Sequence, residues 1–485
     1  MSRKAAPRWP KVPASFVRAM LAGHSELGLV LGAVIYLVCL SGTLAVFVNE
    51  FQLWEQPDSP IVTTVQPAAV GRAMQAVHAQ VGPGIGDLYA TMPADGAPRL
   101  IVSVFGPDVD RGWVADATGA LADEDRTPWT EFVAELHMRL MLPRPVGEVL
   151  VGVVGVALMA LLISGLLAHP RIFRDAFDFR LAGSRRLREA DIHNRLSVWA
   201  LPFHVAVTLT GAFFGLATVL VAALTTLSHE NPMRLLDGPA MAADAAPAPF
   251  PDVAAILIDA EAAQPGGQTT FVGVERPCTA GQRVMVGIDM PSRLARGERL
   301  YFDGSGRQIG AGGYVSGPLG LQAYAAAASL HFGTFGGEPV KLVYGVLGLA
   351  LSVVSAGGIS IWLVRRRDQG RPLPVLEKIW PACVWGTPLA LGVAFLGSRL
   401  LPPSPVFWVT LTGLAGLSVL FRDGIAASRW LRAALVGVLA GLVILELALS
   451  KGAGLTGYAG RINAALALAA ITIAIPLAIA RRRAG

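Results

Sequence analysis

Long runs of apolar residues alternate with short, polar and often basic stretches along most of the chain. An α-helix needs roughly 20 such residues to cross the hydrocarbon core of a bilayer. The runs predict eight membrane-spanning helices, at about residues 27–48, 146–168, 196–227, 340–364, 380–400, 405–420, 433–450 and 462–480. The pattern therefore predicts a predominantly α-helical integral membrane protein.

Two long segments without such runs interrupt the spans, at about residues 50–144 and 228–338. Each begins with helical apolar spacing, at residues 67–81 and 251–263, and continues with short runs typical of strands. The expected strands are residues 87–91, 99–105, 112–116, 269–274, 283–289 and 298–302. We therefore expect two small α+β domains outside the membrane.

Turns and a connector complete these two outer segments. The last expected strand of each is followed by an Asp-x-x-Gly turn, from Asp116 to Gly119 and from Asp303 to Gly306. An Ala/Pro-rich stretch at residues 241–251 predicts a flexible connector.

The membrane segments repeat in register. The pair Ser41-Gly42 begins 17 positions after His24, and the pair Thr210-Gly211 begins 17 positions after His193. Each half would therefore contain a span, an outer domain, a histidine and a return span. Because both halves have the same orientation, their pseudo-symmetry axis should run along the membrane normal.

This duplication divides the chain into three regions. The first repeat is expected at residues 1–175, the second at 176–370, and a membrane region of four helices at 371–485. The last region contains no histidine, and its contact with a quinol, a partner protein or lipid stays open.

Composition and charge agree with a membrane location. Hydrophobic residues make up 53% of the chain and charged residues 15%, with a net charge of +6. Lys and Arg collect in short loops on one side, which predicts that both termini are cytoplasmic and both large loops periplasmic. The expected location is a bacterial-type inner membrane. The basic charge needs no nucleic-acid partner. No Rossmann or Walker pattern indicates nicotinamide or ATP binding.

Six of the eight histidines lie at or near span ends: His24, His137, His169, His193, His204 and His331. A histidine at membrane depth is costly unless it has a partner, and a set of them marks a cofactor or a proton route. The duplication would bring His24 to face His193 near the cytoplasmic surface, and His137 to face His331 near the outer surface. Facing imidazoles are common axial ligands of haem iron.

His204 and His169 have apolar counterparts in the other repeat. His204 follows His193 by 11 residues, which on a continuous helix returns within roughly 20° of the same face, about 16 Å further along. We treat both as further candidate haem ligands. The alternative for each histidine is an interfacial or packing residue.

A set of motifs over about residues 12–370 resembles a known family. The motifs are His24-Ser-Glu-Leu-Gly28, Leu136-His137, His169-Pro-Arg171, Asp191-Ile-His193, Trp199-Ala-Leu-Pro-Phe-His204 and Leu330-His331-Phe-Gly-Thr-Phe-Gly-Gly337. In these the chain resembles the PepSY-associated transmembrane proteins, also called iron-regulated membrane proteins, which include di-haem ferric-siderophore reductases of the inner membrane. The resemblance implies PepSY-like outer domains and two b haems held by four of the six histidines.

The expected function is therefore that of a haem-containing oxidoreductase, a ferric-chelate reductase. It would pass electrons from a quinol or a cytosolic reductase to periplasmic ferric iron, expected as a ferric siderophore or another ferric chelate, for iron uptake. Reduction weakens binding by hard oxygen ligands, so iron is released. The alternative is a non-enzymatic PepSY membrane protein that binds peptide or regulates a periplasmic protease.

Overall fold

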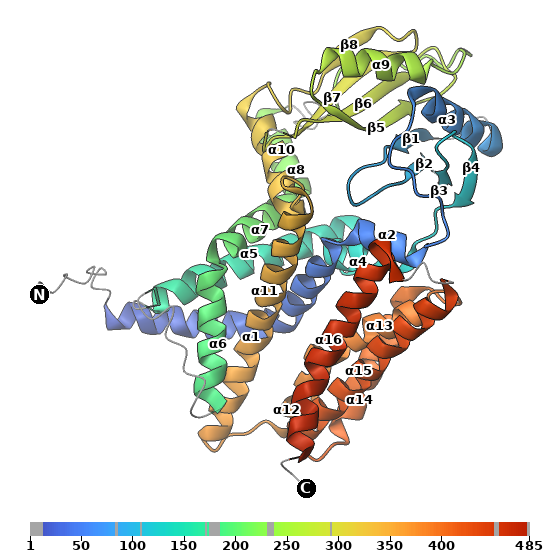
Figure 1. Cartoon of the computed structure of the whole chain (residues 1–485). Coiled ribbons are helices and arrows are strands. Elements are labelled where there is room, and N and C mark those ends of the chain that lie inside the picture. The colour runs from blue at the N-terminus through green and yellow to red at the C-terminus, as the bar shows by residue number, and fades with distance from the viewer. Residues whose placement is uncertain are drawn as a thin grey trace, which may run out of the picture.

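A bundle of helices carries a β-sheet over one end (Figure 1). The computed structural model describes residues 13–82, 86–106, 109–169, 172–173, 185–229, 237–291, 293–450 and 455–482. We call the end of the bundle below the sheet the sheet end. The opposite end, where Arg186 pairs with Asp368, is called the basic end. Arg174 and Arg180, within the segment 174–184, lie outside the described residues.

All eight expected membrane segments are helical, and within the described ranges six helices are long and apolar enough to cross a bilayer. Those six are α1 (Ala14–Ala45), α5 (Arg144–Ala168), α11 (Gly337–Asp368), the combined segment Pro374–Gly397, α15 (Gly424–Leu449) and α16 (Gly457–Arg482). The combined segment consists of α12 (Pro374–Pro381), the π-helical turn η2 (Ala382–Gly386) and α13 (Thr387–Gly397). Helix α14 (Pro403–Val419), with 17 residues, is apolar but shorter.

The expected third span is not one continuous helix. It consists of α6 (Arg185–Trp199), α7 (Leu201–Gly215) and α8 (Ala217–Ser228), with a bend of 73° between α6 and α7. Pro202 lies in the first turn of α7. Proline has no backbone N–H to donate and its ring clashes with the preceding turn, so it separates the two helices. The predicted single face for His193 and His204 was therefore wrong.

The two repeats interlock in the membrane, because the return span of each packs against the entry span of the other. Gly155 of α5 lies against Ala212 of α7, and Gly348 of α11 lies against Thr43 of α1. A Cβ at either glycine would come within about 3.1 Å of its neighbour. Small residues at these contacts let the helices approach closely.

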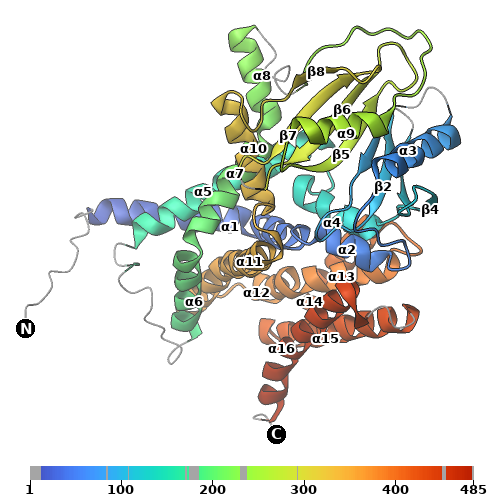
Figure 2. The same ribbon diagram turned by 45° about the horizontal axis from the view of Figure 1, so that its top comes forward.

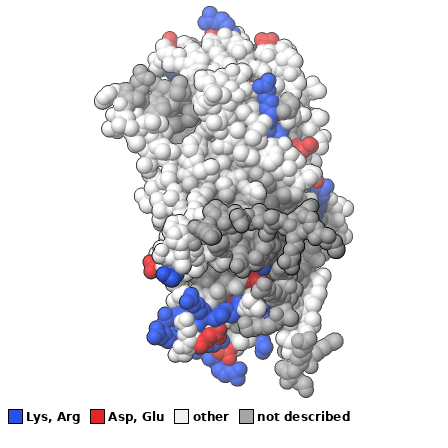
Figure 3. All heavy atoms as spheres, turned by 90° about the vertical axis from the view of Figure 1, so that its left-hand side faces the viewer, with Lys and Arg blue, Asp and Glu red and all other residues white. Residues whose placement is uncertain are grey.

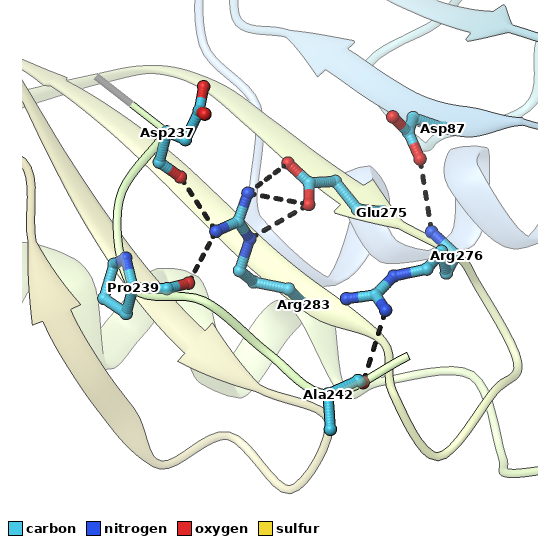
Figure 4. Close-up of polar contacts among 7 residues, drawn as sticks. All are labelled: Asp87, Asp237, Pro239, Ala242, Glu275, Arg276 and Arg283. Atoms are coloured by element: carbon cyan, nitrogen blue, oxygen red, sulfur yellow. Dashed lines mark hydrogen bonds and ion pairs between the residues drawn. The ribbon is translucent and has the colours of Figure 1, made fainter. Parts of the chain in front are cut away.

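The outer segments contribute to one continuous eight-stranded antiparallel sheet. Its strands are β1 (Asp87–Thr91), β2 (Leu100–Phe105), β3 (Asp110–Ala115), β4 (Leu121–Glu124), β5 (Gln268–Glu275), β6 (Arg283–Asp289), β7 (Gly297–Asp303) and β8 (Gln308–Ala311). The strand order is β4-β3-β2-β1-β5-β6-β7-β8, so β1 and β5 join the repeats. Across this seam Leu88 pairs with Val274, and the Arg276 N–H donates to the Asp87 carboxylate over 3.2 Å (Figure 4).

Helices α3 (Pro67–Val81) and α9 (Val253–Ala263) lie side by side on one face of this sheet (Figure 2). Alternate strand residues such as Leu88, Ala90, Val272 and Val274 are fully buried in the same core. This is the period of two that a sheet with one covered face requires.

The six expected strands occur within two residues of their predicted bounds, but β4 and β8 were not predicted. Each has only four residues, too few for an alternating apolar signal. The predicted turns lead into them. The Asp116 carboxylate accepts bonds from the N–H groups of Thr118 and Ala120, and Asp303 does the same for Ser305 and Arg307.

The stretch at residues 241–251 is not a free connector, contrary to expectation. The Ala248 N–H donates to the Cys278 carbonyl, and the stretch forms a bridge with the loop between β5 and β6. Pro239 lies just before this stretch, and its carbonyl oxygen accepts a hydrogen bond from Arg283, which also pairs with Glu275 (Figure 4). Backbone bonding and this guanidinium therefore fasten the segment to the sheet.

The C-terminal helices dock on the first repeat at the sheet end. Trp54 of α2 (Val48–Glu55) stacks on Phe395 of α13 with ring centres 4.0 Å apart, and its indole N–H donates to Asn463 of α16. Trp129 of α4 (Pro128–Arg139) donates to the Leu391 carbonyl over 3.0 Å. Aromatic packing and satisfied indole N–H groups thus hold the last four segments against α2 and α4.

Charged side chains are unevenly distributed over the molecule. On the face shown in Figure 3, Lys and Arg gather at the lower end, and the broad region above them is mostly uncharged. This is the distribution expected of a bundle surrounded by lipid with one basic interface.

The seam between β1 and β5 can be tested by cross-linking. Tyr89 and Gly273 are direct partners across it, so a Tyr89→Cys/Gly273→Cys variant in a Cys278→Ser background should form a disulfide under mild oxidation. Non-reducing electrophoresis after cleavage between the repeats would report the bond.

A matched control is the Tyr89→Cys/Phe271→Cys variant, because Phe271 pairs with Thr91 and lies diagonally opposite Tyr89 at roughly 7–8 Å. Equal cross-linking of both variants would contradict the register.

Candidate functional site

The structure brings four of the six candidate histidines together as two facing pairs. The ring centres of His24 and His193 are 6.5 Å apart, with planes at 88°. Those of His137 and His331 are 6.2 Å apart, with planes at 17°. The first pair lies towards the basic end, and the second lies at the sheet end on α4 and α10 (Leu319–Phe332). Both pairs join equivalent positions of the two repeats.

In the first repeat, each paired histidine lies against a glycine of a neighbouring helix. His24 Nδ1 lies 3.1 Å from the Leu161 carbonyl oxygen of α5, four residues before Gly165. His137 Nδ1 lies 3.0 Å from the Val38 carbonyl oxygen of α1, four residues before Gly42. A Cβ added at either glycine would meet the imidazole Cε1, at 3.1 Å from Gly165 and 2.6 Å from Gly42.

The second repeat has a related arrangement. His193 Nδ1 lies 2.9 Å from the Val354 carbonyl oxygen of α11, four residues before Gly358, and a Cβ at Gly358 would be in ordinary contact with the imidazole, 3.9 Å from its Cε1. His331 contacts Gly211 of α7, since a Cβ there would lie 2.9 Å from its Cε1. Its Nδ1 lies 3.0 Å from the Thr210 hydroxyl, which itself donates to a carbonyl of α7.

These histidine–glycine contacts have a common physical origin. A helical carbonyl oxygen keeps a second lone pair after it accepts its own backbone bond. Glycine four residues later carries no Cβ to cover that oxygen, so an imidazole from another helix can reach it. A carbonyl only accepts, hence Nδ1 must carry the ring proton. Nε2 is left with its lone pair, the form in which imidazole binds a metal.

A cavity of about 300 Å³ adjoins the first pair. It lies between α1, α5, α6 and α11, and both His24 and His193 line it. Its other lining residues include Gly28, Gly32, Gly165, Gly358, His169, Trp362 and Arg365. An apolar slot with small residues and an arginine at its mouth suits a flat hydrophobic group that carries carboxylates.

A glutamate of a neighbouring helix, Glu55, stabilises the helix that carries His137. Glu55 at the end of α2 accepts from the Trp129 and Thr130 N–H groups, both at 2.9 Å, and from the Thr130 hydroxyl. It thereby caps the N-terminus of α4, which carries His137. Burial raises the pKa of the Glu55 carboxyl, against the lowering effect of these bonds. No sequence motif pointed to Glu55, because the cap and its helix are far apart in the chain.

His169 and His204 do not join a facing pair. His169 Nδ1 lies 3.0 Å from the Gly165 carbonyl oxygen of its own helix terminus, at the wall of the cavity. His204 is fully buried, and neither ring nitrogen has a hydrogen-bond partner in the described part of the chain. Its nearest aromatic contact is Phe203, with ring centres 5.9 Å apart.

The two remaining histidines lie away from both pairs. His78 is on α3, with its Nε2 3.3 Å from the Cys278 sulfur. His229 forms the left-handed C-cap of α8.

The contact between Gly42 and His137 can be tested without reference to any ligand. Gly42→Ala should lower thermal stability by about 1–3 kcal/mol, because its Cβ would overlap the imidazole and displace it from the Val38 carbonyl. Gly28→Ala on the same helix is the control, since its Cβ would lie 3.8 Å from the nearest atom. Thermal unfolding in detergent measures both; equal stability of the two variants would exclude the close contact.

Comparison with known proteins covers the part of the chain that holds the six candidate histidines. The chain is 27% identical over 321 residues to a protein of Pseudomonas aeruginosa named "Uncharacterized protein PA4219", an overlap of 61% of this chain and 81% of the relative. The family model described as the PepSY-associated TM region matches residues 21–365, which include all six candidate histidines. The chain therefore belongs to the PepSY-associated transmembrane family.

Proposed function

We propose that the chain binds two b-type haems and carries electrons across the membrane to ferric iron. One haem would be held by His24 and His193, and the other by His137 and His331. The observation that supports this most directly is the spacing of the two pairs, 6.5 and 6.2 Å between ring centres.

That spacing fits one iron atom between two imidazoles. A metal–imidazole bond is about 2 Å long and the ring centre lies roughly 1 Å beyond the nitrogen, so two rings on opposite sides of an iron have centres about 6 Å apart. Rotation about these bonds lets the ring planes take any relative angle. The observed angles of 88° and 17° are therefore both compatible with axial ligation.

The protein's own contribution is to orient the rings and exclude water. The carbonyl oxygens of Leu161, Val354 and Val38 hold three of the Nδ1 protons, which fixes the tautomer and leaves each Nε2 with its lone pair. The Thr210 hydroxyl has this role for His331. When bound, haem supplies one-electron redox chemistry whose potential depends on these ligands and on burial.

The two pairs would serve opposite faces of the membrane. His24 and Gly42, which mark the two levels on α1, are separated by about 27 Å of helix. By the positive-inside rule the basic end would face the cytoplasm, so a quinol or a cytosolic reductase would donate electrons near His24 and His193. A ferric chelate under the sheet would take one electron per iron near His137 and His331. Oxygen chelators hold the resulting ferrous ion less tightly.

His169 and His204 are not axial ligands in this proposal. Each lacks an opposing imidazole among the described residues, whereas the four paired histidines have one. His169 remains at the cavity wall, close to Arg365, where it can bond a carboxylate of the bound group.

Haem content of single variants tests the assignment. His→Ala at His24 or His193 should remove one haem, about half of the reduced-minus-oxidised b-type absorbance, and His→Ala at His137 or His331 the other half. A variant lacking one histidine of each pair should contain none. His169→Ala, His204→Ala and the control His78→Ala should retain both haems. Absence of haem from wild-type protein produced with adequate haem would leave the peptide-binding alternative.

Electron transfer is tested separately in vesicles. Wild-type protein in vesicles loaded with a reductant should reduce an external ferric chelate, detected with an Fe(II)-specific dye. His24→Ala and His331→Ala should each lower the rate at least about tenfold, because either loss interrupts the path between the two faces. Normal haem content without transmembrane reduction would disprove the reductase function and leave the haem sites standing.

A further inference from the structure

A second cavity, of about 340 Å³, lies at the basic end between the repeats and the C-terminal helices. Residues from α6, α11, α12, η2 and α15 line it. On α11 its lining includes Ser360 and Val364, whereas Gly358 and Trp362 line the cavity beside His24. The two cavities therefore lie on different faces of α11 at similar depth.

Three arginines from three different helices line this second cavity. They are Arg188 of α6, Arg367 of α11 and Arg432 of α15, and one acidic residue, Glu377, lines it with them. Three cations against one anion give the lining a net charge of +2. Figure 3 shows the wider accumulation of Lys and Arg at this end. Such a site at a membrane interface attracts an anion.

Further carboxylates near Arg367 belong to other pairs. Asp423 and Asp368 both act on Arg367 electrostatically. Asp423 is bonded to Arg422, and Asp368 is paired with Arg186. They therefore do not cancel the charge of the cavity lining.

Glu377 gives the cavity a hydrogen-bond acceptor in addition to its positive charge. It is paired with Arg367, and its side chain is only 11% exposed. Its Oε1 is buried and has no hydrogen-bond partner in the described part of the chain. A buried, unpaired acceptor is costly. The occupant should therefore offer a hydrogen-bond donor as well as a negative charge.

The aromatic residues of the cavity are already engaged. The Arg432 guanidinium lies over the Trp385 ring, 5.4 Å from its centre. The Trp380 indole N–H donates to the Ser360 hydroxyl over 3.0 Å, and Trp380 is buried. These engagements disfavour a stacked planar ring such as a quinone or a flavin. The remaining wall is aliphatic, with Leu363, Val364, Pro381, Val384 and Ile425.

We propose that this cavity binds the headgroup of an anionic glycerophospholipid of the phosphatidylglycerol type. Its phosphate bonds the guanidiniums of Arg188, Arg367 and Arg432, and a headgroup hydroxyl donates to Glu377 Oε1. Acyl chains follow the aliphatic wall into the bilayer. The bound lipid joins α6 and α11 of the second repeat to α12 and α15.

Lipid binding by the purified full chain tests this site. Native mass spectrometry in detergent would count bound lipids after addition of phosphatidylglycerol, phosphatidylcholine or soluble glycerol phosphate. Wild type should retain one phosphatidylglycerol in preference to phosphatidylcholine. Arg188→Gln and Arg432→Gln should each weaken this binding about tenfold or more, as expected for loss of a charged hydrogen bond.

Arg429→Gln is the matched control, because Arg429 lies on α15 at the same end but does not line the cavity. It should bind as wild type does. Thermal unfolding in detergent checks that each variant is folded; if Arg432→Gln is not, Arg188→Gln at an exposed position decides.

Three results would overturn the proposal. Equal retention of phosphatidylcholine would show that the headgroup charge is not recognised. Equal weakening by Arg429→Gln would indicate diffuse charge attraction in place of a site. Occupancy by glycerol phosphate that displaces the lipid at similar concentration would assign the site to a soluble phosphate.

Discussion

The candidate site depends on a backbone carbonyl that glycine leaves uncovered inside a membrane helix. An imidazole in an apolar bundle needs a partner for its N–H group, since no water is at hand to supply one. Leu161, Val38 and Val354 each offer a carbonyl oxygen beside a glycine of the same helix. The same contact that satisfies Nδ1 also determines the direction in which Nε2 points. Three of the four paired imidazoles are held in this way, and the Thr210 hydroxyl takes the place of the carbonyl for His331.

The histidines held by these contacts form pairs because equivalent positions occur in both repeats. Each histidine is held within its own repeat, while its facing partner comes from the other. The distance inside a pair is therefore determined by how the repeats meet, through the close glycine contacts of α5 with α7 and of α11 with α1. At the sheet end a second constraint acts, because β1 and β5 join the outer segments in one register. The sheet is thus continuous with the helices that bear His137 and His331, and it restrains the symmetry of the bundle from outside the membrane.

Much of this was accessible from the sequence, and the failures have physical causes. The register from His24 to Ser41-Gly42, repeated from His193, predicted a duplication, but the role of the glycine depends on an oxygen that no residue name reveals. Apolar runs located all eight helical segments and alternation located six strands. The four-residue strands β4 and β8 gave no such signal. A proline in an otherwise apolar run, Pro202, was sufficient to bend the third span and to move His204 out of its predicted register.

The last four segments remove the symmetry that the repeats establish. At the sheet end they contact α2 and α4 of the first repeat, through Trp54 and Trp129. At the basic end they meet α6 and α11 of the second repeat around the cavity lined by Arg188 and Arg367. The two histidine pairs therefore have unequal surroundings: His137 lies on a helix capped by Glu55 and held by packed indoles, whereas His193 lies on a helix that also borders a polar cavity. Burial and nearby charge tune a redox group, so under the proposed function this asymmetry would give the two levels different environments although their paired histidines occupy equivalent positions.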